Sequence, residues 1–284
     1  WMNPIRLLAL DLDDTLLRGD LTISFRSKSV IKKVEDIGIT VILASGRAPK
    51  AMESYARELG MHKRPGFMIC NNGTIILESH TGNVVQSRLL PQDAAQTVFD
   101  LIDAEGLPVQ IYEHDTIYVS RRNEFADQDQ KLTGLRQVVV ENFKAMIAAG
   151  AQKLVIPGDP MLLQPLESIL KTYVGDRLTI FTSKPYFLEI LPPACGKGEA
   201  LAVVAENLQI PAREVMAIGD SMNDESMLRW AGYGVCMKNG DVRMKAIASM
   251  LTERTNEDDG VAYLLERYIL GDQVLPSLRE QPDE

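Results

Sequence analysis

Residues 5–15 read IRLLALDLDDT, a nearly continuous apolar run that ends in a cluster of acids. A second apolar run, ITVILAS, occupies residues 39–45, and the segment between them, SFRSKSVIKKVEDIG (24–38), has the apolar spacing of a helix. Strands that are apolar throughout are buried on both faces, which is typical of a parallel sheet covered by helices. The sequence therefore predicts a βαβ unit and an α/β fold.

The same alternation of strand and helix returns near the C-terminus, whereas the middle of the chain has a different pattern. The predicted C-terminal elements are helix 196–210, strand 214–221, helix 224–232, strand 233–237, helix 242–249, a short strand in 249–253 and helix 260–270. Between 84 and 193, helices are mixed with alternating or adjacent strands, which suits an antiparallel sheet. We therefore expect a core domain (1–83 and 194–284) interrupted by an inserted α+β domain (84–193).

Composition excludes several classes of partner. The 30 Lys and Arg against 39 Asp and Glu give a net charge of −9, so we expect no nucleic-acid partner. No apolar run reaches the length of a membrane span, so we expect no membrane association and a cytoplasmic protein. Cys70, Cys195 and Cys236 lack any paired spacing, so we interpret them as buried free thiols.

Acids gather where the first predicted strand ends, at Asp11, Asp13 and Asp14, followed by Thr15. In an extended chain Asp11 and Asp13 point to the same side. Carboxylates this close repel one another unless a cation joins them, and Mg²⁺ prefers oxygen ligands. The alternative is a polar exit from the strand, with an Asp capping a turn.

Three further segments lie at predicted strand ends or helix starts. They are Gly219-Asp220-Ser221-Met222-Asn223-Asp224, Ser45-Gly46-Arg47 and Gly196-Lys197-Gly198. The first offers oxygen ligands or a helix cap, the second a hydroxyl and a backbone N–H for phosphate, and the third a counter-ion for carboxylates. Because ligands bind beyond the carboxyl ends of strands in open α/β sheets, we expect these segments to converge.

Taken in order, these segments resemble the motifs of the haloacid dehalogenase superfamily of phosphatases: DxDxT at Asp11, Asp13 and Thr15, then Ser45, Lys197 and the GDxxND of 219–224. The NNG at 71–73 and the inserted domain are similar to the Cof-like branch with a C2-type cap. The resemblance implies a Rossmann-like core with helices on both faces and a cap that sets specificity. The chain departs from the family pattern at Asp14, where Gly is commonest.

The resemblance also implies roles for individual residues. Asp11 would be the nucleophile that forms an aspartyl-phosphate, and Asp13 the general acid and base. Mg²⁺ is the implied cofactor, with Asp11, the backbone carbonyl of Asp13, Asp220 and Ser221 as ligands. The implied phosphate-binding residues are Leu12, Ser45, Gly46, Lys197 and Asn223, and the implied supporting residues are Thr15, Arg47 and Asp224.

The resemblance favours hydrolysis of small phosphorylated metabolites, with sugar phosphates ahead of flavin or pyridoxal phosphates. Two alternatives stay open: a phosphotransferase or mutase with the same intermediate, and a phosphorylatable magnesium-binding regulatory module without turnover. Candidate specificity residues in the cap are His114, Tyr118, Arg121 and Tyr186. The sequence leaves open whether the protein is a monomer or a dimer.

Overall fold

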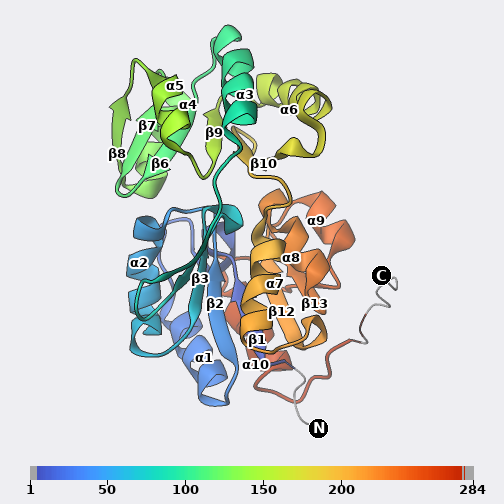
Figure 1. Ribbon diagram of the computed structural model, residues 1–284. Helices are drawn as coiled ribbons and strands as arrows, with labels where there is room; N and C mark the ends of the chain where they lie inside the picture. Colours follow the sequence, from blue (N-terminus) through green and yellow to red (C-terminus); the bar gives the residue numbers. More distant parts are fainter. Residues whose placement is uncertain (1–4, 277, 279–284) are drawn as a thin grey trace.

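The computed structural model describes residues 5–276 and 278. Within them the chain forms one sheet of eight strands and one of six. Figure 1 shows two lobes. We call the eight-stranded sheet with its helices the core lobe, and the six-stranded sheet with its helices the cap lobe.

The core sheet has the strand order β14-β13-β12-β1-β2-β3-β4-β5. Its strands are β1 (Leu7–Leu10), β2 (Thr40–Ala44), β3 (Phe67–Cys70), β4 (Ile75–Glu78), β5 (Val84–Ser87), β12 (Val215–Gly219), β13 (Tyr233–Cys236) and β14 (Met250–Leu251). The six strands from β14 to β3 pair in parallel. This confirms the predicted α/β fold.

The continuous apolar run of β1 is explained by burial on both faces of the sheet. Leu8 and Leu10 belong to one apolar cluster, while Leu7 and Ala9 belong to another. Because successive side chains of a strand point to opposite faces, every residue of β1 contacts one cluster or the other. Both faces are therefore covered by helices, as expected.

The core helices divide between these two clusters. They are α1 (Phe25–Asp36), α2 (Pro49–Glu58), α7 (Lys197–Asn207), α8 (Glu225–Trp230), α9 (Val242–Ile247) and α10 (Gly260–Tyr268). Helices α1, α2 and α10 pack on the face of Leu8, and α7, α8 and α9 on the face of Leu7. Helix α1 begins after Ser24, whose side chain accepts a hydrogen bond from the Ser27 N–H.

The edge of the core sheet differs from the sequence prediction. Strands β4 and β5 form an antiparallel hairpin on β3. The predicted boundary at residue 84 is therefore wrong, since the chain stays in the core sheet up to Ser87. Strand β5 is mostly exposed, so its short sequence, VVQS, carries no apolar pattern long enough to mark a strand.

The cap lobe is a mainly antiparallel sheet with the order β10-β11-β9-β6-β7-β8. Its strands are β6 (Gln110–Glu113), β7 (Thr116–Val119), β8 (Arg136–Val139), β9 (Leu154–Pro157), β10 (Thr179–Lys184) and β11 (Phe187–Leu191). Its helices are α3 (Gln92–Ala104), α4 (Glu124–Thr133), α5 (Phe143–Ala149) and α6 (Pro160–Val174). Three of these elements, α4, β8 and α5, are not among those predicted from the sequence.

Two segments connect the lobes, and one side chain joins them. The guanidinium of Arg88, on the outgoing segment, donates hydrogen bonds to the carbonyl oxygens of Pro193 (2.9 Å) and Ala194 (2.7 Å) on the returning segment. The two crossings are thus tied together at one point.

Two expectations from composition are tested by the described residues. Cys70, Cys195 and Cys236 are free and buried, as expected. Among the helices of residues 5–276 and 278, none is both long and apolar enough to cross a membrane.

Candidate active site

The predicted motifs meet at the carboxyl ends of three neighbouring strands. Asp11 follows β1, Ser45 follows β2 and Asp220 follows β12, and β1 pairs with both of the other strands. Segments separated by more than two hundred residues of chain, such as those of Asp11 and Asp220, therefore share one edge of the sheet. This is where open α/β sheets bind their ligands.

Four buried residues form what we call the core cluster: Asp11, Lys197, Asp220 and Asp224. The Lys197 ammonium donates to Asp11 Oδ1 and to Asp224 Oδ1, both at 2.6 Å, and its side chain is 0% exposed. Lys197 opens α7 after Gly196. A cation so deeply buried is stable only when paired, so the two carboxylates hold it in place.

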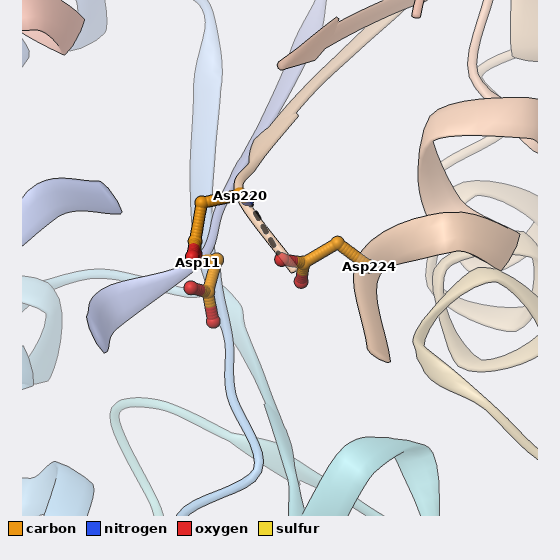
Figure 2. Close-up of side chains that lie close together, drawn as sticks. All are labelled: Asp11, Asp220 and Asp224. Atoms are coloured by element: carbon orange, nitrogen blue, oxygen red, sulfur yellow. Dashed lines mark hydrogen bonds between the residues drawn. The ribbon is translucent and has the colours of Figure 1, made fainter. Parts of the chain in front are cut away.

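Figure 2 shows the three carboxylates of the core cluster close together. One Asp224 oxygen accepts hydrogen bonds from the backbone N–H groups of Asp220 (2.9 Å, dashed in Figure 2) and Ser221 (3.1 Å). Thr15 donates its hydroxyl to Asp220 Oδ1 at 3.0 Å. Asp224 and Thr15 thus orient their neighbours, and their supporting roles in catalysis stay predictions.

Three carboxylates against one lysine leave the core cluster with excess negative charge. Burial first, and then repulsion from Asp224, raises the pKa of Asp11 to about 7. Burial and repulsion from Asp11 and Asp224 raise the pKa of Asp220 well above its ordinary value. For Lys197, attraction from Asp11 and Asp224 outweighs burial and raises the pKa. The cluster is electrostatically suited to a second cation.

The donor set fits a divalent metal ion. Asp11, Asp220 and Asp224 offer oxygens that lie within 4.8 Å of one another. Asp224 uses both oxygens in the contacts above, whereas Asp11 and Asp220 each use Oδ1 in the hydrogen bonds described and keep Oδ2 for a ligand. A hard cation such as Mg²⁺ prefers carboxylate oxygens. Asp11 and Asp220 are therefore the ligands best supported by this geometry; Asp13 and Ser221 stay predictions.

Asp13 does not join the core cluster but pairs with Arg47. The guanidinium donates from Nε to Asp13 Oδ2 (2.8 Å) and from Nη2 to Oδ1 (2.7 Å), a bidentate contact. Burial disfavours the charge on Asp13, yet these hydrogen bonds outweigh it and hold the pKa below its ordinary value. Among the neighbouring cations, Arg47 lowers the pKa of Asp13 the most.

Asp14, where the family pattern has Gly, adopts a left-handed backbone with φ of 58°. Asp tolerates this region better than most residues, so the turn keeps the shape that Gly would favour. Its carboxylate also accepts a hydrogen bond from Lys184 Nζ of the cap lobe at 2.8 Å. The substitution thus preserves the turn and adds an ion pair between the lobes.

The predicted phosphate-binding residues lie around Asp11, and each has different contacts in the structure. Gly46 and Asn223 line the pocket above it. The Ser45 hydroxyl accepts from the Arg47 N–H at 3.2 Å, and Ser221 donates to the Asn223 side chain at 2.8 Å. The Leu12 side chain is buried in the core, so only its backbone is available to a ligand. Lys197 has a third N–H beyond its two contacts.

The cap lobe contributes polar residues that the sequence analysis missed. We call Tyr112, Asp129, Lys153 and Glu189 the cap cluster; all four line the pocket over Asp11. Lys153 Nζ donates to Glu189 Oε2 at 3.0 Å, and the Tyr112 hydroxyl and the Gln110 amide donate to Asp129. Only the NNG motif, which contacts this cluster through Asn72, offered a signal in the sequence.

Hydrogen bonds join the cap cluster to the core lobe. Lys153 Nζ donates to the Gly46 carbonyl at 2.8 Å, and Asn72 Nδ2 donates to Glu189 Oε2 at 2.7 Å. Asn72 Oδ1 in turn accepts from Asn223 Nδ2 at 3.0 Å. The position of the cap lobe is thereby linked to Gly46 and Asn223.

Both lobes line the pocket over Asp11, which has a volume of about 90 Å³. From the core lobe, Asp11, Asp13, Gly46, Arg47, Ser221 and Asn223 line it. The four cap residues proposed from the sequence lie elsewhere in the described chain. His114 is in the turn between β6 and β7, Arg121 pairs with Asp103, and Tyr118 packs beside the cap interior. Tyr186 packs edge-on against Phe187, which does line the pocket.

Comparison with known proteins identifies the family. The family model for haloacid dehalogenase-like hydrolases matches residues 8–265. The chain is 30% identical over 266 residues to the 5-amino-6-(5-phospho-D-ribitylamino)uracil phosphatase YcsE of Bacillus subtilis, which covers 94% of this chain and 96% of that protein. It is also 30% identical over 241 residues to the HMP-PP phosphatase of Escherichia coli O6:H1, with 85% and 87% covered.

A solved structure agrees. The crystal structure of a haloacid dehalogenase-like hydrolase from Bacteroides thetaiotaomicron matches with a TM-score of 0.82 at 31% identity, over 93% of this chain and 99% of that chain. The fold and the order of the motifs agree with this match. The chain therefore belongs to the haloacid dehalogenase-like hydrolases, and within them it is a phosphatase.

Proposed function

We propose that the protein is a magnesium-dependent phosphomonoesterase that forms an aspartyl-phosphate on Asp11. The observation that carries this proposal is the core cluster, in which one lysine and two neighbouring carboxylates surround Asp11 at a strand end. Asp11 is buried yet lines the pocket, so one carboxylate oxygen can reach a phosphorus atom there.

In the first step an Asp11 oxygen attacks phosphorus in line with the ester oxygen. The new O–P bond forms as the P–O bond to the leaving group breaks, and Asp13 gives the departing alkoxide its proton. Lys197 keeps its hydrogen bond to Asp11 Oδ1 and so orients the attacking carboxylate. Its third N–H and the backbone N–H groups of Leu12 and Gly46 donate hydrogen bonds to the phosphoryl oxygens and stabilise their negative charge.

Arg47 explains how Asp13 can carry a proton. In the ligand-free pairing Arg47 holds Asp13 ionised. A substrate phosphate that enters the pocket also attracts the guanidinium, because Arg binds phosphate and carboxylate in the same bidentate way. Once Arg47 turns to the phosphate, burial raises the affinity of Asp13 for a proton, and Asp13 becomes a competent acid.

In the second step Asp13, now ionised, takes a proton from water, and the water oxygen attacks phosphorus. The bond to Asp11 breaks, inorganic phosphate leaves, and Asp13 releases its proton to solvent as Arg47 pairs with it again. One residue serves as acid and then as base because the proton it gives away in the first step is replaced from water in the second.

Mg²⁺ held by Asp11 and Asp220 would neutralise their excess charge and that of the phosphate, so that two anions can approach each other. It would also keep Asp11 ionised, because a nearby cation reverses the rise of its pKa. The backbone carbonyl of Asp13 and the Ser221 hydroxyl are the further ligands that we propose.

The substrates are small phosphorylated metabolites, with sugar phosphates as our first candidates. The polar cap cluster over the pocket supports a leaving group with hydroxyls. The name of one relative specifies a phosphorylated ribitylaminouracil, which keeps phosphorylated nitrogen heterocycles in the test panel.

The test is hydrolysis of an aryl phosphate with Mg²⁺ and with a chelator, in wild-type protein and Asp11→Asn. We expect release of inorganic phosphate without an acceptor, loss of activity with the chelator, and a fall in turnover of at least about 10⁴-fold for Asp11→Asn. Circular dichroism provides the control for folding. Undiminished turnover by folded Asp11→Asn would reject the nucleophile.

A further inference from the structure

The guanidinium of Arg47 has a second partner besides Asp13, the aromatic ring of Tyr55 on α2. The central carbon of the guanidinium lies 5.5 Å from the centre of this ring. At such a distance the face of the ring attracts the cation, and the attraction is stronger where water is excluded. Because the Arg47 side chain is only 7% exposed, this contact is largely shielded from water.

The backbone of Arg47 is fixed, whereas its side chain depends on its contacts. The Arg47 N–H donates to the Ser45 hydroxyl at 3.2 Å, and the Arg47 carbonyl accepts from the Asn71 N–H at 2.9 Å. Holding so long a side chain in one conformation costs rotamer entropy. In the described part of the chain, Asp13 and Tyr55 alone make a hydrogen bond, ion pair or ring contact with the guanidinium.

The ring of Tyr55 is itself held at two points. Its body packs against the apolar cluster of Leu8, on one face of the core sheet. Its hydroxyl donates a hydrogen bond to the Leu21 carbonyl at 3.2 Å. Leu21 lies in residues 17–24, which connect the turn after Asp11 to α1. Tyr55 therefore offers Arg47 a ring face whose position is fixed by the core lobe.

The two partners of Arg47 respond differently when a substrate enters. The proposed mechanism requires the guanidinium to leave Asp13 for the phosphate. Its bidentate hydrogen bonds to Asp13 are directional, so they are lost when the guanidinium turns. Attraction to a ring face depends mainly on the distance to that face, so it persists while the guanidinium turns above the ring. Tyr55 is thus the contact that can remain during the exchange.

The pocket over Asp11 separates the role of Tyr55 from that of Arg47. Arg47 and Asp13 line this pocket, whereas Tyr55 does not. The contacts to Asp13 use Nε and Nη2 of Arg47, and within the described residues Nη1 donates no hydrogen bond. A phosphate in the pocket can therefore engage Nη1 first. Any effect of Tyr55 on the reaction would pass through Arg47 and not through contact with the substrate.

We propose that Tyr55 is a positioning residue for Arg47. Its ring keeps the guanidinium beside the pocket while the partner of Arg47 changes from Asp13 to the substrate phosphate. The hydrogen bond to Leu21 keeps the ring in place. The inference rests on the proposed phosphatase function and adds to it a residue outside the motifs.

The test compares variants that remove the ring with one that keeps it. Tyr55→Leu and Tyr55→Met remove the aromatic face and keep an apolar side chain against the core, while Tyr55→Phe loses only the hydroxyl. Tyr268→Leu is the matched control, because Tyr268 packs against the same apolar cluster and lies over Arg267, away from the pocket. Each variant is made alone and together with Arg47→Met, and melting curves check that it folds.

Two quantities are measured with Mg²⁺: kcat/KM for an aryl phosphate, and the affinity for inorganic phosphate by isothermal titration. We expect both ring-free variants to lower kcat/KM about tenfold and to weaken phosphate binding. Tyr55→Phe should recover most of the lost activity, and Tyr268→Leu should change neither quantity. When Arg47→Met is already present, loss of the ring should cost nothing further, because Tyr55 acts through Arg47.

Three results would overturn the inference: no loss in either ring-free variant, a loss of the same size when Arg47→Met is present, or a Tyr55→Phe as impaired as Tyr55→Leu. Failure of the proposed function looks different. A wild-type protein that binds inorganic phosphate but hydrolyses no aryl phosphate would reject that function. The phosphate affinities of the variants would then still decide whether Tyr55 positions Arg47.

Discussion

The core cluster and the cap cluster are both buried and both contain a lysine, yet their charges balance differently. In the core cluster Lys197 faces three carboxylates, whereas in the cap cluster Lys153 forms a one-to-one pair with Glu189. Asp129 of the cap cluster is satisfied by donors from Tyr112 and Gln110. An excess of buried charge indicates a site that needs a ligand, and a balanced pair indicates a structural support.

Lys197→Met is the variant from which we expect the largest effect, and it tests whether the core cluster depends on its lysine. The variant leaves Asp11, Asp220 and Asp224 without their cation, so we expect a loss of about 3–5 kcal/mol in the free energy of unfolding, together with loss of turnover. Urea unfolding in the presence of a chelator measures the first, and phosphate release the second. The control is Lys63→Met at an exposed position. A free energy of unfolding equal to that of the control would show that Lys197 does not stabilise the core cluster.

The next test concerns the balanced pair of the cap cluster. We expect Lys153→Met and Glu189→Gln each to destabilise the protein, since each leaves a buried charge without its counter-ion, and the double variant to lose less than the sum. A double-mutant cycle by urea unfolding should give a coupling energy of about 1–3 kcal/mol. Strictly additive losses would show that the two residues act independently.

The smallest expected effect is the pH dependence of the metal-free protein. The folded state holds a proton on Asp11 more tightly than the unfolded chain, because the pKa is raised from 3.8 to about 7. The stability from this group is complete below the unfolded pKa and is lost as the pH rises through the folded value. We expect the chelated protein to melt a few degrees lower at pH 8 than at pH 5, and the drop to be smaller in Asp11→Asn. A Tm that rises over this range would contradict the assignment.

The core site was predictable because its residues stand where strands end. Asp11, Ser45 and Asp220 each follow an apolar run, and parallel strands bring such positions to one edge of the sheet. What the sequence could not show was the pairing of individual groups. That Arg47 pairs with Asp13, while Lys197 pairs with Asp11, depends on distances that only the fold determines.

The cap cluster could not be predicted from local patterns. Glu189 lies in the middle of β11, where Leu188 and Ile190 point to the cap interior, so an alternating pattern places Glu189 on the opposite, solvent-facing side. In the fold that side faces the core lobe, and Glu189 is buried. A contact between lobes has no periodicity in the sequence, which is why the polar residues over the pocket were missed.

The guanidinium of Arg88 bridges the two chain crossings between the lobes. Two independent tethers would let one half of the molecule twist, tilt and slide against the other. Because Arg88 fastens the two crossings to each other, they form one pivot, about which the lobes can turn but past which they cannot easily slide. We therefore expect entry of the ester and departure of phosphate to involve rotation of the lobes about this pivot.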